Sequence, residues 1–243
     1  MKISVVIPAH NEEENLPKVV RRVDNLRPLL KAKYDLEIVV VNDGSTDGTG
    51  RVAEELAEKH NSIKVVHHEI RKGLTKALET GFKVASGDIL IFIPADMESD
   101  PLNDIPKLLT KLNEGYDMVV GWKQRRSGWR YVASYIYNFL IRTVLRTPVH
   151  DANWIKAFRR PVLRALVFKD GWHRYFVVLA RWAGFRVGEV KVQYRPREHG
   201  RTKYGHIMTV IKGGLDFLRV MKYIRALSKA RSHGRRKHLR HEE

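Results

Sequence analysis

The chain has 243 residues, 43% of them hydrophobic, so it can bury a full core and is not a disordered polypeptide. It contains no cysteine, which excludes a disulfide framework, a thiolate metal site and a cysteine nucleophile. A formal charge of +18 predicts an anionic partner, either a nucleic acid, an acidic membrane surface or a phosphorylated substrate. The apolar stretches are too short for a signal peptide or a bilayer span, so we expect a cytoplasmic protein, at most peripheral to a membrane.

Strand-like and helical patterns alternate in the first half of the chain. The strand-like runs are residues 3–7, 37–41, 63–67 and 89–93, and the helical patterns between them cover 13–26, 49–60 and 74–86. This alternation predicts βαβ units and a mainly parallel sheet. Ligands of such sheets bind at the carboxyl ends of the strands. The polar residues that follow these runs are His10, Asn11, Glu12, Asn42, Asp43, Asp96 and Glu98.

The second half of the chain is organised differently. An apolar stripe at helical spacing runs from position 129 to 144, beside a basic patch, and a second amphipathic helix is expected within 206–227. We expect one domain over residues 1–228, with a first half at 1–121 and a second half at 122–228. Residues 229–243 form a basic tail without core periodicity, which predicts an irregular segment.

Two turns at predicted strand ends are candidate ligand-binding loops. In "NDGSTDGT", Asp43 precedes a flexible glycine and residues able to cap a helix. A capped turn with no ligand explains this segment equally well. Arg71 and Lys72 precede another helix start, where cations oppose the helix dipole unless a shared anion binds there. Without further context, a solvated basic loop is the simpler reading.

The stretch "IFIPADMESDP" carries three acids after an apolar run. Asp96 and Glu98 alternate on a chain expected to be extended, so both can face one side and hold Mg²⁺ or Mn²⁺ together with a diphosphate. Asp100, which precedes Pro101, is interpreted as a helix cap.

Two later segments complete the candidate site. Asp151 lies just ahead of a strand-like segment and is either a base, a residue that orients the acceptor, or a turn residue. In "YRPREHGRTKYGH", several cations surround Gly200, so this loop either wraps a phosphate or is an ordinary basic surface loop.

Taken together, these motifs resemble family 2 glycosyltransferases of the GT-A fold. The shared segments occur in the family's order over about residues 3–225, and they are "VVIPAHNEEENL", "VVVNDGSTDGT", "RKGLTKALETGF", "GDILIFIPADMESDP", "HDANWIKAFRR" and "REHGRTKYG". An ordered set is more specific than any single motif. The branch most similar to the chain transfers sugars to polyprenyl phosphates, as the dolichol-phosphate mannose synthases do.

The resemblance implies a nucleotide-sugar-binding half at 1–121, an acceptor-binding half at 122–228 and a role for each matching residue. The nucleotide-sugar donor would be held by Pro8, His10, Asn11, Glu12, Asp43, Arg71, Lys72 and Asp96. Asp96 matches the second acid of the family's Asp-x-Asp motif and would bind the metal with Glu98. Asp151 matches an acidic position on the acceptor side. The basic positions near the lipid phosphate are matched by Lys123, Arg197 and Lys203.

Some residues depart from the family pattern. Pro94 replaces the first acid of the Asp-x-Asp motif, and Tyr135 stands where the mannose synthases commonly have a basic residue. His10 stands where the family often has a tyrosine that stacks on the base. A relative that acts on another polyprenyl phosphate or another sugar therefore fits better than the mannose synthase itself.

The expected reaction is inverting transfer of a hexose from a UDP- or GDP-sugar to a polyprenyl (dolichyl) phosphate at an anionic membrane surface. In this reaction, the metal stabilises the departing diphosphate and the lipid phosphate attacks directly. Spare apolar surface would touch lipid, form a dimer or bind a membrane subunit. The alternatives are a transferase with a hydroxyl acceptor, which needs Asp151 as base, a sugar-nucleotide binder without activity, and a non-catalytic basic protein that binds nucleic acid. No nucleic-acid-binding motif is recognisable, so we expect no nucleic acid partner.

Overall fold

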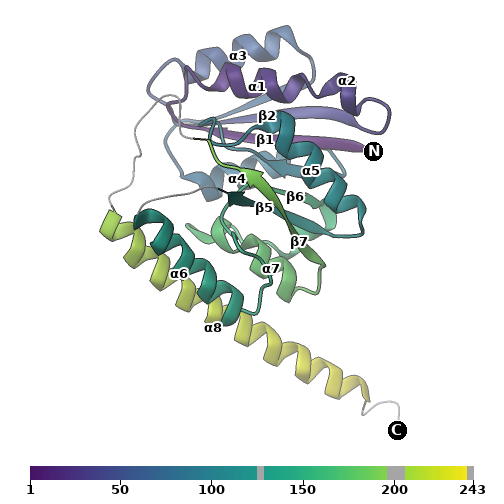
Figure 1. Cartoon of the computed structure of the whole chain (residues 1–243), viewed down its shortest axis with the longest axis vertical. Helices are drawn as coiled ribbons and strands as arrows, with labels where there is room; N and C mark the ends of the chain where they lie inside the picture. Colours follow the sequence, from purple (N-terminus) through teal and green to yellow (C-terminus); the bar gives the residue numbers. More distant parts are fainter. Residues whose placement is uncertain (125–128, 196–205, 240–243) are drawn as a thin grey trace. The chain divides into compact units, whose positions relative to one another are not determined.

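The structure is a computed structural model that describes the backbone of residues 1–124, 129–195 and 206–239 (Figure 1). Residues 1–202 form one compact unit and residues 203–243 a second one. Each unit is described by itself below.

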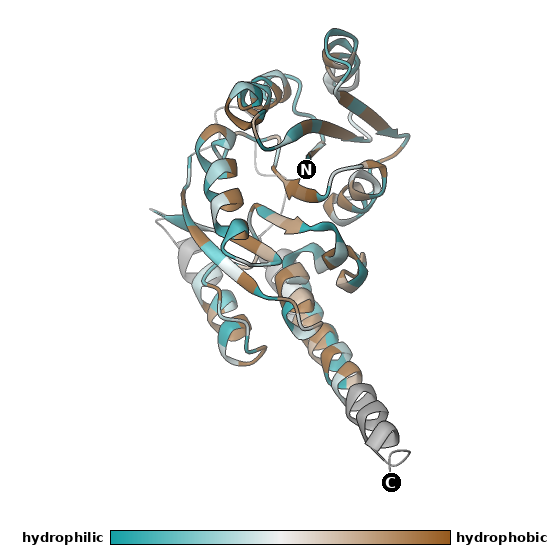
Figure 2. Ribbon diagram, turned by 90° about the vertical axis from the view of Figure 1, so that its right-hand side faces the viewer, coloured by the Kyte–Doolittle hydropathy of each residue, from teal (hydrophilic) through white to brown (hydrophobic). Residues whose placement is uncertain are grey.

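The first unit is built on a seven-stranded sheet, which confirms the predicted mainly parallel α/β architecture. The strand order is β3-β2-β1-β4-β6-β5-β7, and β6 alone is antiparallel to its neighbours within the described sheet. The strands are β1 Lys2–Ala9, β2 Asp35–Asp43, β3 Ile63–His68, β4 Ile89–Phe92, β5 Met118–Gln124, β6 Lys156–Arg159 and β7 Val187–Gln193. The continuous apolar runs of β1, β2 and β4 are buried, as expected for strands covered on both faces, and apolar segments are brown in Figure 2.

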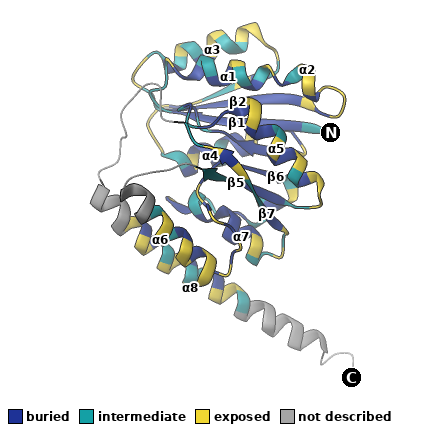
Figure 3. Ribbon diagram, in the orientation of Figure 1, coloured by how far each residue is buried: buried dark blue, intermediate teal, exposed yellow. Residues whose placement is uncertain are grey.

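Helices α1, α4 and α5 bury their apolar stripes beside the sheet, so the buried core follows the strands while the outer faces of these helices are exposed (Figure 3). In α1, Leu16, Val19, Val20 and Val23 recur at helical spacing and are all buried. The helices of this unit are α1 Leu16–Asp24, α2 Arg27–Leu30, α3 Thr49–Lys59, α4 Leu74–Val84, α5 Pro101–Asn113, α6 Trp129–Thr143 and α7 Phe176–Trp182, with 3₁₀ turns η1 Arg160–Ala165 and η2 Trp172–Tyr175.

The strand order puts the topological switch point of the sheet between β1 and β4, where a ligand-binding crevice is expected. The chain goes outward from β1 to β2 and β3, then returns to add β4 on the other side of β1. The register between β1 and β4 ends at Val6 and Phe92, although β1 continues to pair with β2 as far as Ala9. Open α/β sheets bind ligands at such a switch point, outside the carboxyl ends of the strands.

Helix α6 carries apolar residues on both its buried and its exposed sides. Ile136, Phe139, Leu140 and Val144 belong to the apolar stripe predicted from the sequence, and they are 38–54% exposed. The opposite side carries Asn138 and the apolar residues that are buried. The stripe is therefore spare apolar surface of this unit, as expected for a contact with lipid or with another protein.

The second unit is the helix α8, His206–Leu239. The prediction that the chain becomes irregular after residue 228 is wrong up to Leu239, because the helix continues through that segment. Lysine, arginine, alanine and leucine are good helix formers, so a basic run without an apolar stripe can extend a helix. The boundary between the two compact units lies at residue 202.

Candidate functional site

Asp43, at the end of β2, is a buried hub for two loops. Its carboxylate accepts hydrogen bonds from the main-chain N–H groups of Lys72 and Gly73, each at 2.8 Å, and from His68 Nδ1 at 2.8 Å. Its main-chain oxygen accepts a bond from His10 Nδ1 at 2.8 Å. The side chain predicted to contact the nucleoside therefore also fixes the position of the basic loop before α4.

Gly44 allows that loop to approach. Its φ is +60°, a left-handed conformation, and an added Cβ would lie 2.2 Å from the main-chain nitrogen of Arg71. The predicted turn glycine is thus required by both its own conformation and a neighbouring backbone.

The segment after β1 is tied to the segment after β2. Asn11 has a φ of +54°; its main-chain N–H donates to Ser45 Oγ at 3.0 Å, and its side-chain oxygen accepts the N–H of Thr46 at 2.8 Å. The N–H of Glu12 donates to Thr49 Oγ1 at 2.8 Å. Residues that were predicted to share a ligand therefore lie together at the carboxyl edge of β1 and β2, beside the expected crevice.

The acidic segment after β4 is a turn, so the expectation of an extended chain with alternating carboxylates is wrong. β4 ends at Phe92, and Pro94 has no N–H to extend the ladder. Met97 has a φ of +61°, and Asp96 Oδ1 accepts the N–H of Glu98 at 3.2 Å. Both acids are half-buried and keep hard oxygen atoms, which suit Mg²⁺ or Mn²⁺. Within the described residues no cluster supplies three or more His, Asp or Glu ligands.

Asp100 lies at the N-cap position of α5, as predicted, but its side chain does not cap the helix. Its carboxylate instead pairs with Arg22 of α1 at 3.2 Å and with Arg195 after β7 at 2.6 Å. Arg195 also donates its main-chain N–H to the oxygen of Glu98 at 3.0 Å. Two arginines from distant elements therefore hold the acidic turn in place.

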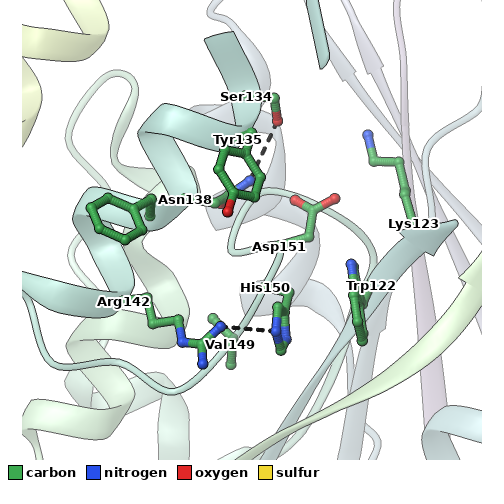
Figure 4. Close-up of a pocket in the computed structure, with 10 residues that line it drawn as sticks. Trp122, Lys123, Ser134, Tyr135, Asn138, Arg142, Val149, His150 and Asp151 are labelled. Atoms are coloured by element: carbon green, nitrogen blue, oxygen red, sulfur yellow. Dashed lines mark hydrogen bonds between the residues drawn. The ribbon is translucent and has the colours of Figure 1, made fainter. Parts of the chain in front are cut away.

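Lys123 and Asp151 line one pocket, at the end of β5 and ahead of β6 (Figure 4). Asp151 is buried, and its Oδ1 accepts the N–H of Asn153 at 3.2 Å. Lys123 Nζ lies 3.5 Å from the ring centroid of Trp154. The other lining residues are Trp122, Ser134, Tyr135, Asn138, Phe139, Arg142, Val149 and His150. Cations and aromatic rings thus share the pocket walls.

Asn138 connects helix α6 to the loop that carries Asp151. Its side-chain oxygen accepts the N–H of Ala152 at 3.1 Å, and its Nδ2 donates to Ser134 Oγ at 3.3 Å. Sequence reasoning missed this residue, although a single amide side chain within the apolar and aromatic run from residue 135 to 141 was a usable signal.

The direction of β6 explains why Asp151 reaches this edge. Because β6 is antiparallel to β4 and β5, it begins at the edge where those strands end. The residues just ahead of β6 therefore lie at the same edge as Asp96, which follows β4, and Lys123, which is next to the last residue of β5, Gln124.

Lys156, the first residue of β6, is a buried cationic side chain that the sequence analysis did not identify. It is fully buried, and its Nζ has no hydrogen-bond partner among the described residues. The rings of Phe92 and Phe176 have their centroids 5.4 and 5.9 Å from Nζ. Burial lowers the pKa of Lys156 to about 7, although the negative charge of Asp151 opposes this shift.

Two predicted residues, Arg197 and Lys203, lie outside the described part of the chain. In the described part, no helix is both long and apolar enough to cross a bilayer.

Comparison with known proteins gives a family and a set of relatives. The sequence profile of Glycosyl transferase family 2 matches residues 4–174. The undecaprenyl-phosphate 4-deoxy-4-formamido-L-arabinose transferases of Klebsiella pneumoniae subsp. pneumoniae and of Klebsiella pneumoniae strain 342 are both 33% identical over 213 residues. Those residues are 86% of this chain and 64% of each relative, so the chain spans somewhat less than two thirds of their length.

Solved structures with a similar fold include glucosyl-3-phosphoglycerate synthase from Mycobacterium tuberculosis. Its complex with Mn²⁺, UDP and phosphoglyceric acid superposes with a TM-score of 0.64 at 26% identity, covering 82% of this chain and 72% of that one. Its complex with Mn²⁺ and UDP-glucose gives a TM-score of 0.63 at 26% identity, covering 83% and 72%. These matches confirm the predicted fold.

Proposed function

Because the chain belongs to glycosyl transferase family 2, we propose that it is an inverting glycosyltransferase that moves a sugar from a nucleotide-sugar donor to a polyprenyl phosphate. One observation carries the choice of acceptor. The pocket that contains Lys123 and Asp151 is also lined by Tyr135 and Phe139 of α6, whose side chains are 60% and 53% exposed. A site with cations inside and apolar surface leading away from it suits an anionic head group on an apolar chain.

The donor side is proposed to be the crevice between β1 and β4. Its loops are held by the hydrogen bonds of Asp43, Asn11 and Glu12, so a nucleotide meets a largely preformed surface. The M. tuberculosis synthase was solved with UDP and UDP-glucose, which supports a UDP-sugar as the donor here. Arg71 and Lys72 are exposed beside this crevice and add positive charge next to the nucleotide.

Asp96 and Glu98 would hold the divalent cation. Two half-buried carboxylates in a turn leave coordination positions for diphosphate oxygens and water, which is the usual manner of binding for Mg²⁺ and Mn²⁺ beside phosphates. When bound, the cation supplies charge stabilisation to the departing diphosphate. The arginine pairs of Asp100 keep this turn in place, so they position the two acids.

On the acceptor side, Lys123 would position a phosphate that is already an anion near neutral pH. Such a nucleophile needs no base, and attack from the side opposite the leaving diphosphate inverts the anomeric carbon. Asp151 would then orient the sugar or the acceptor. A hydroxyl acceptor would instead require Asp151 to remove a proton, so the two acceptor classes differ in how much the reaction depends on this carboxylate.

The exposed stripe of α6 would meet the lipid surface, with basic residues attracted to anionic head groups on the cytoplasmic side. The names of the two Klebsiella relatives refer to undecaprenyl phosphate, a lipid acceptor, which supports this placement.

The test is a calorimetric titration with UDP and GDP, each with Mn²⁺ and with EDTA, on the native protein and on Asp96→Ala. We expect metal-dependent binding of UDP that Asp96→Ala abolishes, followed by transfer of radiolabelled sugar from UDP-sugars to a polyprenyl phosphate. A protein that binds neither nucleotide in any condition is not a transferase of this kind. In that case, binding of nucleic acid by the basic surface becomes the leading hypothesis.

A further inference from the structure

A chain of three polar side chains ends at the wall of the pocket, and the proposed reaction leaves it unused. Glu189 of β7 accepts the main-chain N–H of His150 at 2.6 Å and lies 2.5 Å from His150 Nδ1. The imidazole of His150 is stacked on Trp122 with ring centroids 4.0 Å apart and planes at 12°. Its Nε2 lies 2.9 Å from Nη1 of Arg142 in α6.

These contacts define the direction of each hydrogen bond. A carboxylate can only accept, so His150 Nδ1 carries a proton and donates it to Glu189. A guanidinium can only donate, so Arg142 donates to His150 Nε2. The imidazole is thus neutral and joins Glu189 to Arg142. Since its ring is also fixed by Trp122, it holds the guanidinium in one place at the pocket wall (Figure 4).

Most donors of Arg142 are still available to a ligand. A guanidinium has five N–H donors, and the bond to His150 is the one hydrogen bond that Arg142 makes within the described part of the chain. The residue is exposed and lies on the same helix as Tyr135 and Phe139, which line the pocket too. A fixed, planar donor group with free N–H groups is suited to bidentate binding of a phosphate.

We propose that Arg142 binds the phosphate of the lipid acceptor and that Glu189 and His150 position it for this task. The inference rests on the proposed function, and it identifies the cation that faces the acceptor phosphate together with Lys123. Asp151, in the same pocket, disfavours a second anion beside it, so the phosphate is placed toward Arg142 and Lys123. The apolar chain then leaves the pocket over the exposed face of α6.

The test uses farnesyl phosphate, a short soluble isoprenoid phosphate, with farnesol and inorganic phosphate as comparison ligands. Affinities are measured by calorimetry on the full chain, and UDP with Mn²⁺ is titrated in parallel. The variants are Arg142→Gln, Arg142→Lys and Glu189→Gln. Arg146→Gln is the matched control, because Arg146 is an exposed arginine one turn further along that does not line this pocket.

We expect Arg142→Gln to raise the Kd for farnesyl phosphate roughly tenfold to a hundredfold, the size of one lost charge-assisted pair. Arg142→Lys restores the charge without the planar fork, so it should recover only part of this loss. Glu189→Gln should raise the Kd about threefold to tenfold, since the imidazole is then less firmly held. Binding of farnesol and of UDP with Mn²⁺ should change less than about twofold, which a general structural defect would not allow.

The outcomes separate this inference from the proposed function. If the native protein binds UDP with Mn²⁺ and farnesyl phosphate, and Arg142→Gln binds both as tightly, the role of Arg142 is refuted while the proposed function stands. Full recovery in Arg142→Lys, or an equal loss in Arg146→Gln, would reduce the effect to general charge attraction and would also overturn the inference. If the native protein binds farnesyl phosphate no better than inorganic phosphate, the lipid acceptor and the inference fail together.

Discussion

Replacing Lys156 by methionine should stabilise the protein at neutral pH and remove part of the pH dependence of its stability. The ammonium of Lys156 has no hydrogen-bond partner in the described part of the chain and lies between Phe92 and Phe176, so it is poorly solvated and burial lowers its pKa to about 7 from the ordinary 10.5. In the unfolded chain the same lysine keeps its proton up to about pH 10.5. The unfolded state therefore binds more protons between these two values, and the free energy of unfolding rises with pH across this window.

The magnitude follows from the two pKa values. A difference of one pKa unit corresponds to about 1.4 kcal/mol, so the fully protonated folded state is disfavoured by up to about 5 kcal/mol. From pH 7 to pH 9, loss of the proton from Lys156 in the folded state should raise the free energy of unfolding of the native protein by roughly 2–3 kcal/mol. Methionine has a similar length and no proton to lose, so the variant should lack this contribution and be the more stable protein at pH 7.

The assay is urea unfolding followed by circular dichroism at pH 7, 8 and 9 for the native protein, Lys156→Met and Lys59→Met. Lys59 is an exposed lysine at the end of α3, so its replacement reports the effect of removing a surface charge. The difference in the free energy of unfolding between the native protein and Lys156→Met should change by roughly 2–3 kcal/mol from pH 7 to pH 9. The corresponding difference for Lys59→Met should stay constant over this range. If both differences stay flat from pH 7 to pH 9, the buried amine does not titrate as argued and the reasoning fails.

Three further outcomes follow from the structure. Gly44→Ala should destabilise the fold by more than about 2 kcal/mol and weaken UDP binding, measured by thermal unfolding and calorimetry, because its Cβ would lie 2.2 Å from the backbone of Arg71. Burial raises the pKa of Asp104 to about 6, so its ionisation at pH 7 opposes folding. Asp104→Asn should therefore raise the free energy of unfolding by up to about 3 kcal/mol at pH 7. In urea unfolding, the difference between the variant and the native protein should become smaller toward pH 4. Asp151→Asn should lower kcat less than about tenfold if the acceptor is a lipid phosphate, whereas a loss of about a hundredfold or more would indicate a hydroxyl acceptor.

The parts of the fold that the sequence predicts well are those encoded locally. Residues 3–7, 37–41, 63–67 and 89–93 are short, apolar and β-branched, and each lies within or across a parallel strand. Gly44 was predicted as a turn residue because its neighbours have the composition of a turn. In these segments, the local preference and the tertiary environment favour the same structure.

The features that the sequence did not predict depend on contacts between residues that are far apart in the chain. The alternation of acidic residues at positions 96 and 98 is typical of an extended chain, but β4 ends at Phe92 and Pro94 has no N–H to continue its hydrogen-bond ladder. The partners of Asp100 are Arg22 and Arg195, at 78 and 95 residues' separation, and local patterns carry no information about such pairs. The residues next to Lys156 in the sequence give no indication that its side chain is buried beside aromatic rings, so the sequence does not distinguish it from a surface lysine.

The direction of β6 shows why the candidate site is harder to predict than the sheet. A four-residue strand that begins with lysine has no pattern that specifies parallel or antiparallel pairing. Its direction depends on where the chain re-enters the sheet after α6, and it enters from the edge where β4 and β5 end. Had β6 been parallel, Asp151 would lie at the opposite edge, a full strand length away from Asp96 and Lys123. One reversed strand thus brings residues from both halves of the chain to a single edge, as the proposed transfer between two bound substrates requires.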